Sequence, residues 1–184
     1  MPILKAETEL FPADLLDEIA PRDATRKWWA VHTKSRQEKS LARQLESASV
    51  PFYLPLIASA NIVRGRRIKS RLPLFGGYLF VFADEQERLI TLATKRVAHM
   101  LSADHINEMT RDLLQIRALI ASGVPLTAES RLEPGRRVRV KSGALQGLEG
   151  VVVARRGGDC LLVGVQFLQQ GVSIQINDFQ VEPL

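Results

Sequence analysis

The chain has 184 residues, of which 46% are hydrophobic and 24% are charged. This ordinary globular composition argues against wholesale disorder and allows one domain or two small ones. The net charge of +5 is uneven: residues 1–26 carry a net charge of −3, residues 27–131 carry +7 and residues 132–184 carry +1. The basic middle section favours a polyanionic partner, and a merely soluble basic surface is the alternative.

Membrane insertion, secretion and enzymatic chemistry are all disfavoured by the sequence. The longest apolar run is too short to cross a bilayer and the N-terminus lacks a basic-then-apolar signal pattern, so we expect a cytoplasmic protein. The lone cysteine, Cys160, excludes an intramolecular disulfide and a multi-cysteine zinc site, and it is typical of a core residue. The histidines lack metal-ligand spacing and there is no P-loop, so we expect no catalytic residue, no metal and no cofactor.

The chain opens with a segment whose net negative charge sets it apart from the basic middle section. Residues 1–26 are predicted to be an acidic tail, in which residues 12–19 either form a short amphipathic helix or remain disordered. The aromatic and β-branched run 28–32 predicts a strand. A capping box at Ser35–Glu38 then predicts a helix that ends near residue 47.

Two groups of basic residues come next in the chain. Arg36, Lys39 and Arg43 share one face of the predicted helix, which is either a nucleic-acid surface or a solvated face. Residues 61–69 predict a β-hairpin with Gly65 in its turn. Cations are concentrated in and just after this hairpin, where they either meet phosphate or protect a sheet edge: Arg64, Arg66, Arg67, Lys69 and Arg71.

The remaining first-domain elements predict an α+β fold. Residues 78–82 predict a strand that is apolar on both faces, so that it is either a buried central strand or one covered on one side by a partner protein. The next predicted elements are a helix over 84–94, a strand over 97–101 and a helix that starts near Asp104. We expect helices packed on a mostly antiparallel sheet.

The C-terminal part is predicted to be all-β. Residues 123–131 form a linker without periodicity, and residues 132–184 form a separate domain. Closure of its strands into a small barrel would remove exposed sheet edges. The predicted strands are 137–141, 150–155, 160–167, 172–176 and 180–183.

Two segments resemble one family in the right order. Residues 135–143 with 147–152 resemble the KOW motif, and residues 74–81 with 28–31 resemble the N-terminal (NGN) domain of NusG-type transcription factors. The resemblance implies an NGN domain over 27–122 and a KOW domain over 132–184. The hairpin at 62–67 is most similar to that of RfaH-like specialised paralogues.

The resemblance implies a transcription elongation and antitermination factor without enzymatic activity. Its NGN domain would bind the clamp helices of the largest catalytic subunit of RNA polymerase through Phe75, Tyr78 and Phe80, and would suppress pausing or termination. By position, the residues that match the family's contact with non-template DNA are Lys34, Arg36, Thr94, Lys95 and Arg96. His99 aligns with a family histidine, and we expect it to be packed in its strand.

The KOW domain of this family recruits a second partner, either a ribosomal protein or Rho. Phe167 and Leu168 match its apolar tip, and the alternative is that one of them plugs the barrel. We expect a monomer whose KOW domain stays β-structured, because its glycines and valines disfavour helix. The alternative function is an RNA-binding or ribosome-associated KOW protein without polymerase affinity. Whether the factor is general or operon-specific stays open, with the hairpin favouring the specialist.

Overall fold

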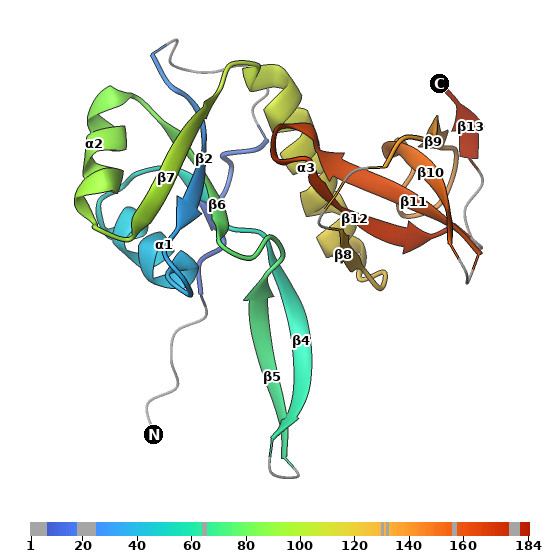
Figure 1. The fold of residues 1–184 in the computed structure, drawn as a ribbon, viewed down its shortest axis with the longest axis horizontal. Helices are drawn as coiled ribbons and strands as arrows, with labels where there is room; N and C mark the ends of the chain where they lie inside the picture. The colour runs from blue at the N-terminus through green and yellow to red at the C-terminus, as the bar shows by residue number, and fades with distance from the viewer. Residues whose placement is uncertain are drawn as a thin grey trace. The chain divides into compact units, whose positions relative to one another are not determined.

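The structure is a computed structural model, and its chain divides into two compact units, Met1–Ile106 and Asn107–Leu184 (Figure 1). The sequence places the last helix of the α+β part in the first domain, whereas this division assigns it to the second unit. Side chains at residues 60–63 and 66–69 are not described. The residues that the structure describes are 7–17, 25–63, 66–129, 131, 133–155, 158–176 and 181–184.

The first unit is built on a five-stranded antiparallel sheet with the order β1-β3-β6-β2-β7. The central strands β2 and β6 are apolar on both faces, which is why the sheet buries both of them. The strands predicted over 28–32, 78–82 and 97–101 are confirmed. The bounds are β1 (Leu10–Phe11), β2 (Lys27–Thr33), β3 (Phe52–Tyr53), β6 (Tyr78–Ala83) and β7 (Val97–Ala103).

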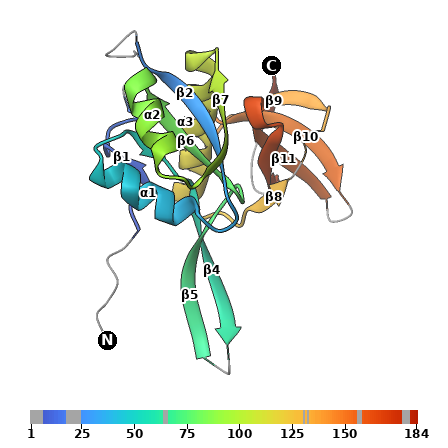
Figure 2. The ribbon, with the colours of Figure 1, turned by 60° about the vertical axis from the view of Figure 1, so that its left-hand side comes forward.

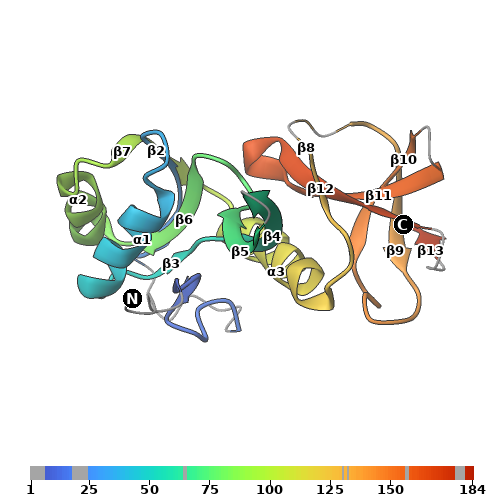
Figure 3. The same cartoon turned by 90° about the horizontal axis from the view of Figure 1, so that it is seen from below.

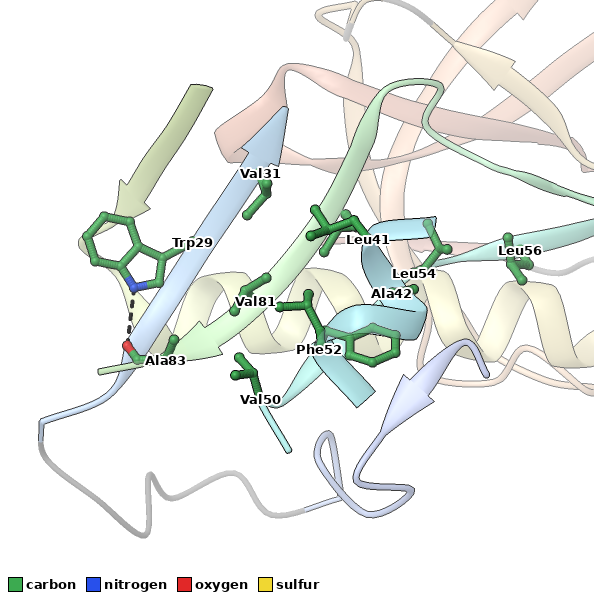
Figure 4. Close-up of a cluster of buried hydrophobic side chains, with 12 residues drawn as sticks. Trp29, Val31, Leu41, Ala42, Val50, Phe52, Leu54, Leu56, Val81 and Ala83 are labelled. Carbon is green, nitrogen blue, oxygen red and sulfur yellow. Dashed lines mark hydrogen bonds between the residues drawn. The ribbon is translucent and has the colours of Figure 1, made fainter. Parts of the chain in front are cut away.

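One face of this sheet packs against helix α1 (Glu38–Ser47), whose Leu41 and Leu45 are fully buried. Trp29 belongs to the cluster of buried hydrophobic side chains between the sheet and α1. Its indole Nε1 donates a hydrogen bond of 3.1 Å to the carbonyl oxygen of Ala83 (Figure 4). The cluster brings together residues from β2, α1, β3, β6 and the loops around them. The amphipathic spacing of α1 therefore serves packing on one side and leaves its basic face outward.

The two helix starts of this unit differ from each other. The capping box predicted at Ser35–Glu38 is wrong, because α1 is preceded by Gln37 without a side-chain cap. Helix α2 (Glu85–Ala93) carries the capping box instead. The Asp84 carboxylate accepts from the Glu87 amide at 2.8 Å, and the Glu87 carboxylate accepts from the Asp84 amide at 3.0 Å.

The predicted hairpin is formed by β4 (Leu56–Val63) and β5 (Arg66–Pro73), which pair from Leu56↔Pro73 to Val63↔Arg66. It extends away from the five-stranded sheet (Figures 1 and 2). Its predicted turn, with Gly65, lies outside the described residues, as does Arg64.

The N-terminal segment does not form the helix considered for residues 12–19, since residues 13–17 lie in turns and residues 18–19 fall outside the described ranges. Strand β1 instead adds an edge to the sheet by pairing with β3, and Leu16 is fully buried. The acidic segment is thus part of the first unit's fold over residues 7–17.

The second unit carries helix α3 (Ile106–Ser122) and an antiparallel sheet with the order β13-β9-β10-β11-β12-β8 (Figures 1 and 3). The five predicted strands are present, and β8, drawn from the predicted linker, adds a sixth by pairing with β12. This confirms an α+β part followed by an all-β part. The strands are β8 (Thr127–Glu129), β9 (Arg136–Val140), β10 (Glu149–Arg155), β11 (Gly158–Val165), β12 (Gln170–Gln175) and β13 (Val181–Pro183).

Candidate functional site

Two loops at one end of the first-unit sheet lie side by side. The loop 34–37 comes directly after β2, and the turn 94–96 precedes β7. The Lys34 amide donates a hydrogen bond of 2.8 Å to the carbonyl oxygen of Arg96, which continues the pairing of the two strands past a bulge at Thr33. The structure therefore brings together the predicted nucleic-acid residues of these two loops, which we call the basic loop cluster: Lys34, Arg36, Thr94, Lys95 and Arg96.

The backbone of the basic loop cluster is strained at two of its cations. Arg36 has φ +57° and Lys95 has φ +60°, a left-handed conformation that is uncommon for residues other than glycine. Such conformations persist only where the surrounding structure enforces them, and they concentrate at functional sites. The side chains of both residues are exposed, as is that of Lys34.

The other two members of the cluster are held by hydrogen bonds. The Arg96 guanidinium donates a hydrogen bond of 3.1 Å to the side-chain oxygen of Gln44, which lies in α1. It donates another to the side-chain oxygen of Gln37, the residue that precedes α1. The Thr94 hydroxyl donates to the Thr91 carbonyl at 2.7 Å. Arg96 and Thr94 therefore fix the loops in place. Sequence reasoning missed Gln37 and Gln44, which no local signal distinguishes from surface glutamines.

Three cations of the cluster, Lys34, Arg36 and Lys95, carry exposed positive charge. Among the ion pairs formed within the described part of the chain, none involves Lys34, Arg36 or Lys95. Several like charges on adjacent loops repel one another unless a counter-charge is supplied. An anionic backbone that carries many phosphates is well suited to supply it.

Three aromatic rings lie beside the basic loop cluster, at the ends of β6, β2 and β7. The His32 ring lies 4.8 Å from the Tyr78 ring and 6.1 Å from the His99 ring, centroid to centroid, and the two imidazoles are nearly parallel at 2°. Tyr78 and His32 are half-buried, while His99 is exposed rather than packed in its strand as expected. His32 is a further residue that the sequence did not single out.

Gly77 joins this aromatic group to α1. Its amide donates to the Glu38 carboxylate at 2.7 Å, and its carbonyl accepts from the Thr33 amide at 2.8 Å. Its φ is +83°, and a β-carbon there would lie 3.2 Å from the Nε2 atom of His32. Glycine is therefore required both by the backbone and by the ring beside it.

The residues predicted to dock on polymerase differ in accessibility. Phe75 and Phe80 are buried, with exposures of 2% and 0%, and their rings meet edge to face at 6.1 Å. Tyr78 is the member of the set whose side chain is partly exposed. Docking through all three side chains stays a prediction, and the burial of the two phenylalanines leaves Tyr78 as the member of the set with accessible surface.

The structure describes the side chains of only some of the basic residues in the hairpin. Arg66 and Arg67 belong to β5, but their side chains are outside the described set, and Arg64 is outside it altogether. At the base of the hairpin, the Arg71 guanidinium bonds the Glu9 carboxylate and also lies 3.5 Å from the Leu56 carbonyl oxygen.

The predicted KOW tip lies in a short 3₁₀ turn, Gln166–Leu168, which comes directly after β11. Phe167 is 40% exposed and Leu168 is half-buried, so Phe167 is available for contact and does not plug the sheet. The turn is held on α3, because the Gln166 amide donates to the Asp112 carboxylate at 2.9 Å.

Helix α3 lines a groove with strands β9, β10 and β11 of the same unit. At this groove the Gln115 side chain accepts a 2.7 Å hydrogen bond from the Glu149 amide. Burial raises the pKa of Asp112 from 3.8 to about 6, against the opposing effect of the hydrogen bond from Gln166.

The described ranges show neither a metal centre nor a membrane-spanning helix. No group of three or more His, Cys, Asp or Glu side chains is arranged there to hold a metal ion. No helix in these ranges combines the length and apolar character that crossing a bilayer requires.

A family model and a solved structure are similar to this chain. The family model described as "Transcription termination factor nusG" matches residues 26–116. A solved structure concerned with domain interaction in Thermotoga maritima NusG is similar over 84% of this chain and 96% of that chain, at 17% sequence identity and a TM-score of 0.49.

The class of protein that residues 26–116 resemble is a transcription factor. The match spans residues 26–116, just under half of the chain, and makes this segment similar to the NusG family.

Proposed function

We propose that this protein is a transcription elongation and antitermination factor. Its first unit binds the clamp helices of the largest catalytic subunit of RNA polymerase, and its basic loop cluster contacts the non-template DNA strand. Bound there, it favours the closed, processive state of the enzyme over paused states, which is a shift of population and needs no chemistry. The second unit recruits a further partner, a ribosomal protein or Rho, through Phe167 and Leu168.

The convergence of the basic loop cluster carries the proposal. Residues from two loops about sixty positions apart meet at one strand end, supported by the hydrogen bond between Lys34 and Arg96. Their cations are exposed, and rings from Tyr78, His32 and His99 lie on the neighbouring strand ends. Cations beside stackable rings suit a single strand, whose bases and phosphates can both be contacted.

The nucleic-acid contact is tested with the variant Lys34→Gln/Arg36→Asn/Lys95→Asn, in which asparagine replaces the residues with positive φ because it tolerates that conformation. Binding of single-stranded DNA should weaken, and the slope of log affinity against log salt should become shallower by about 2, at ~0.7 per lost phosphate contact. The matched control, Arg136→Gln/Arg137→Gln/Lys141→Gln, removes the same charge from exposed positions of the second unit.

The same pair of variants separates the two functions. If the first-unit variant loses binding and the control retains it, the contact is made by the basic loop cluster. If the control variant loses binding to RNA and the first-unit variant retains it, the protein is an RNA-binding KOW protein, and the proposal fails.

Polymerase docking is tested with Tyr78→Ala, because Phe75 and Phe80 are buried and their truncation would also cost stability. Affinity for core RNA polymerase should fall at least tenfold, as expected of an aromatic residue at the centre of an interface. Phe167→Ala is the control: it should leave polymerase affinity unchanged and weaken binding of the second-unit partner. Equal polymerase affinity of wild type and Tyr78→Ala would refute this docking face.

Within this function, we propose that the factor acts on particular operons, as RfaH-like paralogues do, and is not a general factor. The hairpin sequence favours this class. Pausing assays on several templates should then show an effect that depends on one DNA element, whereas an equal effect on all templates would indicate a general factor.

A further inference from the structure

The acidic N-terminal segment is anchored on the first unit, and we call residues 7–17 the strap. Strand β1 pairs with β3, and the Leu54 amide donates to the Glu9 carbonyl at 2.6 Å. The Phe11 ring stacks on Phe52 at 6.4 Å, and Leu16 is fully buried. These contacts use backbone and apolar groups, so they hold the strap in place without its carboxylates.

The carboxylates at the start of the strap bind arginines instead. Glu7 lies 2.6 Å from Arg43 on α1, and Glu9 bonds Arg71 at the base of the hairpin. The two glutamates are two positions apart, so their Cα atoms are separated by at most about 7 Å. Two cations from α1 and β5 therefore meet one short acidic stretch.

These arginines belong to the two basic surfaces singled out in the sequence, the α1 face and the hairpin. Their side chains are 58% and 42% exposed, for Arg43 and Arg71 respectively, so solvent screens both ion pairs. Exposed ion pairs of this kind contribute about 0–1 kcal/mol each. They are weak enough to be exchanged for phosphate, and their contribution to protein stability is small.

An arginine already paired with a carboxylate adds little to nucleic-acid binding. Affinity for a polyanion arises largely from counterions released when cations meet phosphates. A phosphate that reaches Arg43 or Arg71 must displace Glu7 or Glu9, which the anchored strap keeps close at hand. A strap anchored in this way would lower both the affinity and the salt dependence of this surface.

We propose that the strap is an autoinhibitory contact, in which Glu7 and Glu9 occupy Arg43 and Arg71 and so keep single-stranded nucleic acid from the α1–hairpin surface. This inference rests on the proposed nucleic-acid contact and adds a second, masked surface to it. A strand bound at the basic loop cluster, whose Arg96 contacts Gln44 on α1, would bring further phosphates toward the neighbouring Arg43 and compete with Glu7.

The test is Glu7→Gln/Glu9→Gln in the full chain, with a fluorescent single-stranded DNA of mixed sequence as probe. Affinity at low salt should rise about 3- to 10-fold, and the log–log salt slope should steepen by about 1.4, for two added phosphate contacts at ~0.7 each. The control Asp104→Asn/Glu108→Gln removes two exposed acids elsewhere and should raise affinity less, without steepening the slope.

Two further variants test whether the gain in affinity arises from release of Arg43 and Arg71. In an Arg43→Gln/Arg71→Gln background, the added Glu7→Gln/Glu9→Gln change should raise affinity no more than the Asp104→Asn/Glu108→Gln control does and should not steepen the salt slope. A gain in this background as large as that in the wild-type chain would be a general charge effect and would overturn the strap.

The outcomes also separate this inference from the proposed function. Wild-type binding through the basic loop cluster, with no gain in Glu7→Gln/Glu9→Gln, refutes the strap alone. Absence of binding by every chain at low salt refutes both. Melting curves should coincide, because the exchanged ion pairs are exposed.

Discussion

Asp112 makes the stability of the second unit depend on pH. Its pKa is raised from 3.8 to about 6, chiefly by burial, so the folded unit binds a proton there more tightly than the unfolded chain does. The resulting stability is fully present below about pH 4 and is lost as the pH rises to about 6. Two pKa units correspond to about 3 kcal/mol, which we reduce to about 1–2 kcal/mol because the side chain is only half-buried.

The perturbation is Asp112→Asn, which removes the charge and keeps a side-chain oxygen that can accept from the Gln166 amide. We expect the variant to be more stable than wild type by about 1–2 kcal/mol at pH 7 and to show no such advantage at pH 4. Urea unfolding at both pH values, followed by the NMR signals of the β10–β12 amides, measures the difference. The contributions of the other carboxyl groups to the free energy of unfolding cancel when the variant is compared with wild type at the same pH.

A direct titration supports the unfolding experiment. The Gln166 amide donates to a carboxylate, whereas the Glu149 amide donates to the Gln115 carboxamide, which does not titrate. The NMR shift of the Gln166 amide should therefore move with a midpoint near pH 6, and that of Glu149 should not. A Gln166 midpoint near pH 4, or an Asp112→Asn variant less stable than wild type at pH 7, would refute the reasoning.

Further predictions concern tight packing. Gly77→Ala forces a β-carbon against an imidazole at positive φ, so thermal melting should show a loss of about 1–2 kcal/mol, whereas Gly76→Ala, with open space around it, should be near neutral. Gly150→Ala places a β-carbon 2.6 Å from a strand carbonyl, so hydrogen exchange should report a loosened second unit with the first unaffected. Trp29→Phe leaves a buried carbonyl without its donor and should cost about 1–3 kcal/mol in urea unfolding. Retained wild-type stability in Gly77→Ala, Gly150→Ala or Trp29→Phe would contradict the packing described.

Strong hydrophobic patterns correctly predicted strands and helices. A local capping pattern correctly predicted a helix start only where no distant group competed for the capping carboxylate. Ser35–Glu38 and Asp84–Glu87 match the same capping pattern, yet only the second forms a box. Glu38 instead accepts from the Gly77 amide, a donor far away in the chain. No local pattern reveals a distant partner of that kind.

The candidate site was predictable through family resemblance and only partly through residue type. Charge alone does not show that Lys34 and Arg96 adjoin, because a strand pairing brings them together. The N-terminal strap shows the same limit: composition indicated a tail, but the two-residue strand at Leu10–Phe11 and the single side chain of Leu16 are too short a signal to predict anchoring.

The distribution of two rare residue types gives each unit its own optical or chemical reporter. Both tryptophans, Trp28 and Trp29, are buried in β2 of the first unit, and the sole cysteine, Cys160, is buried in β11 of the second. Indole emission therefore monitors the first unit, and the rate of thiol labelling monitors the second, in the unaltered chain. Coincident transitions of the two signals in denaturant would mean that the units unfold as one cooperative body, and separated transitions would give each its own stability.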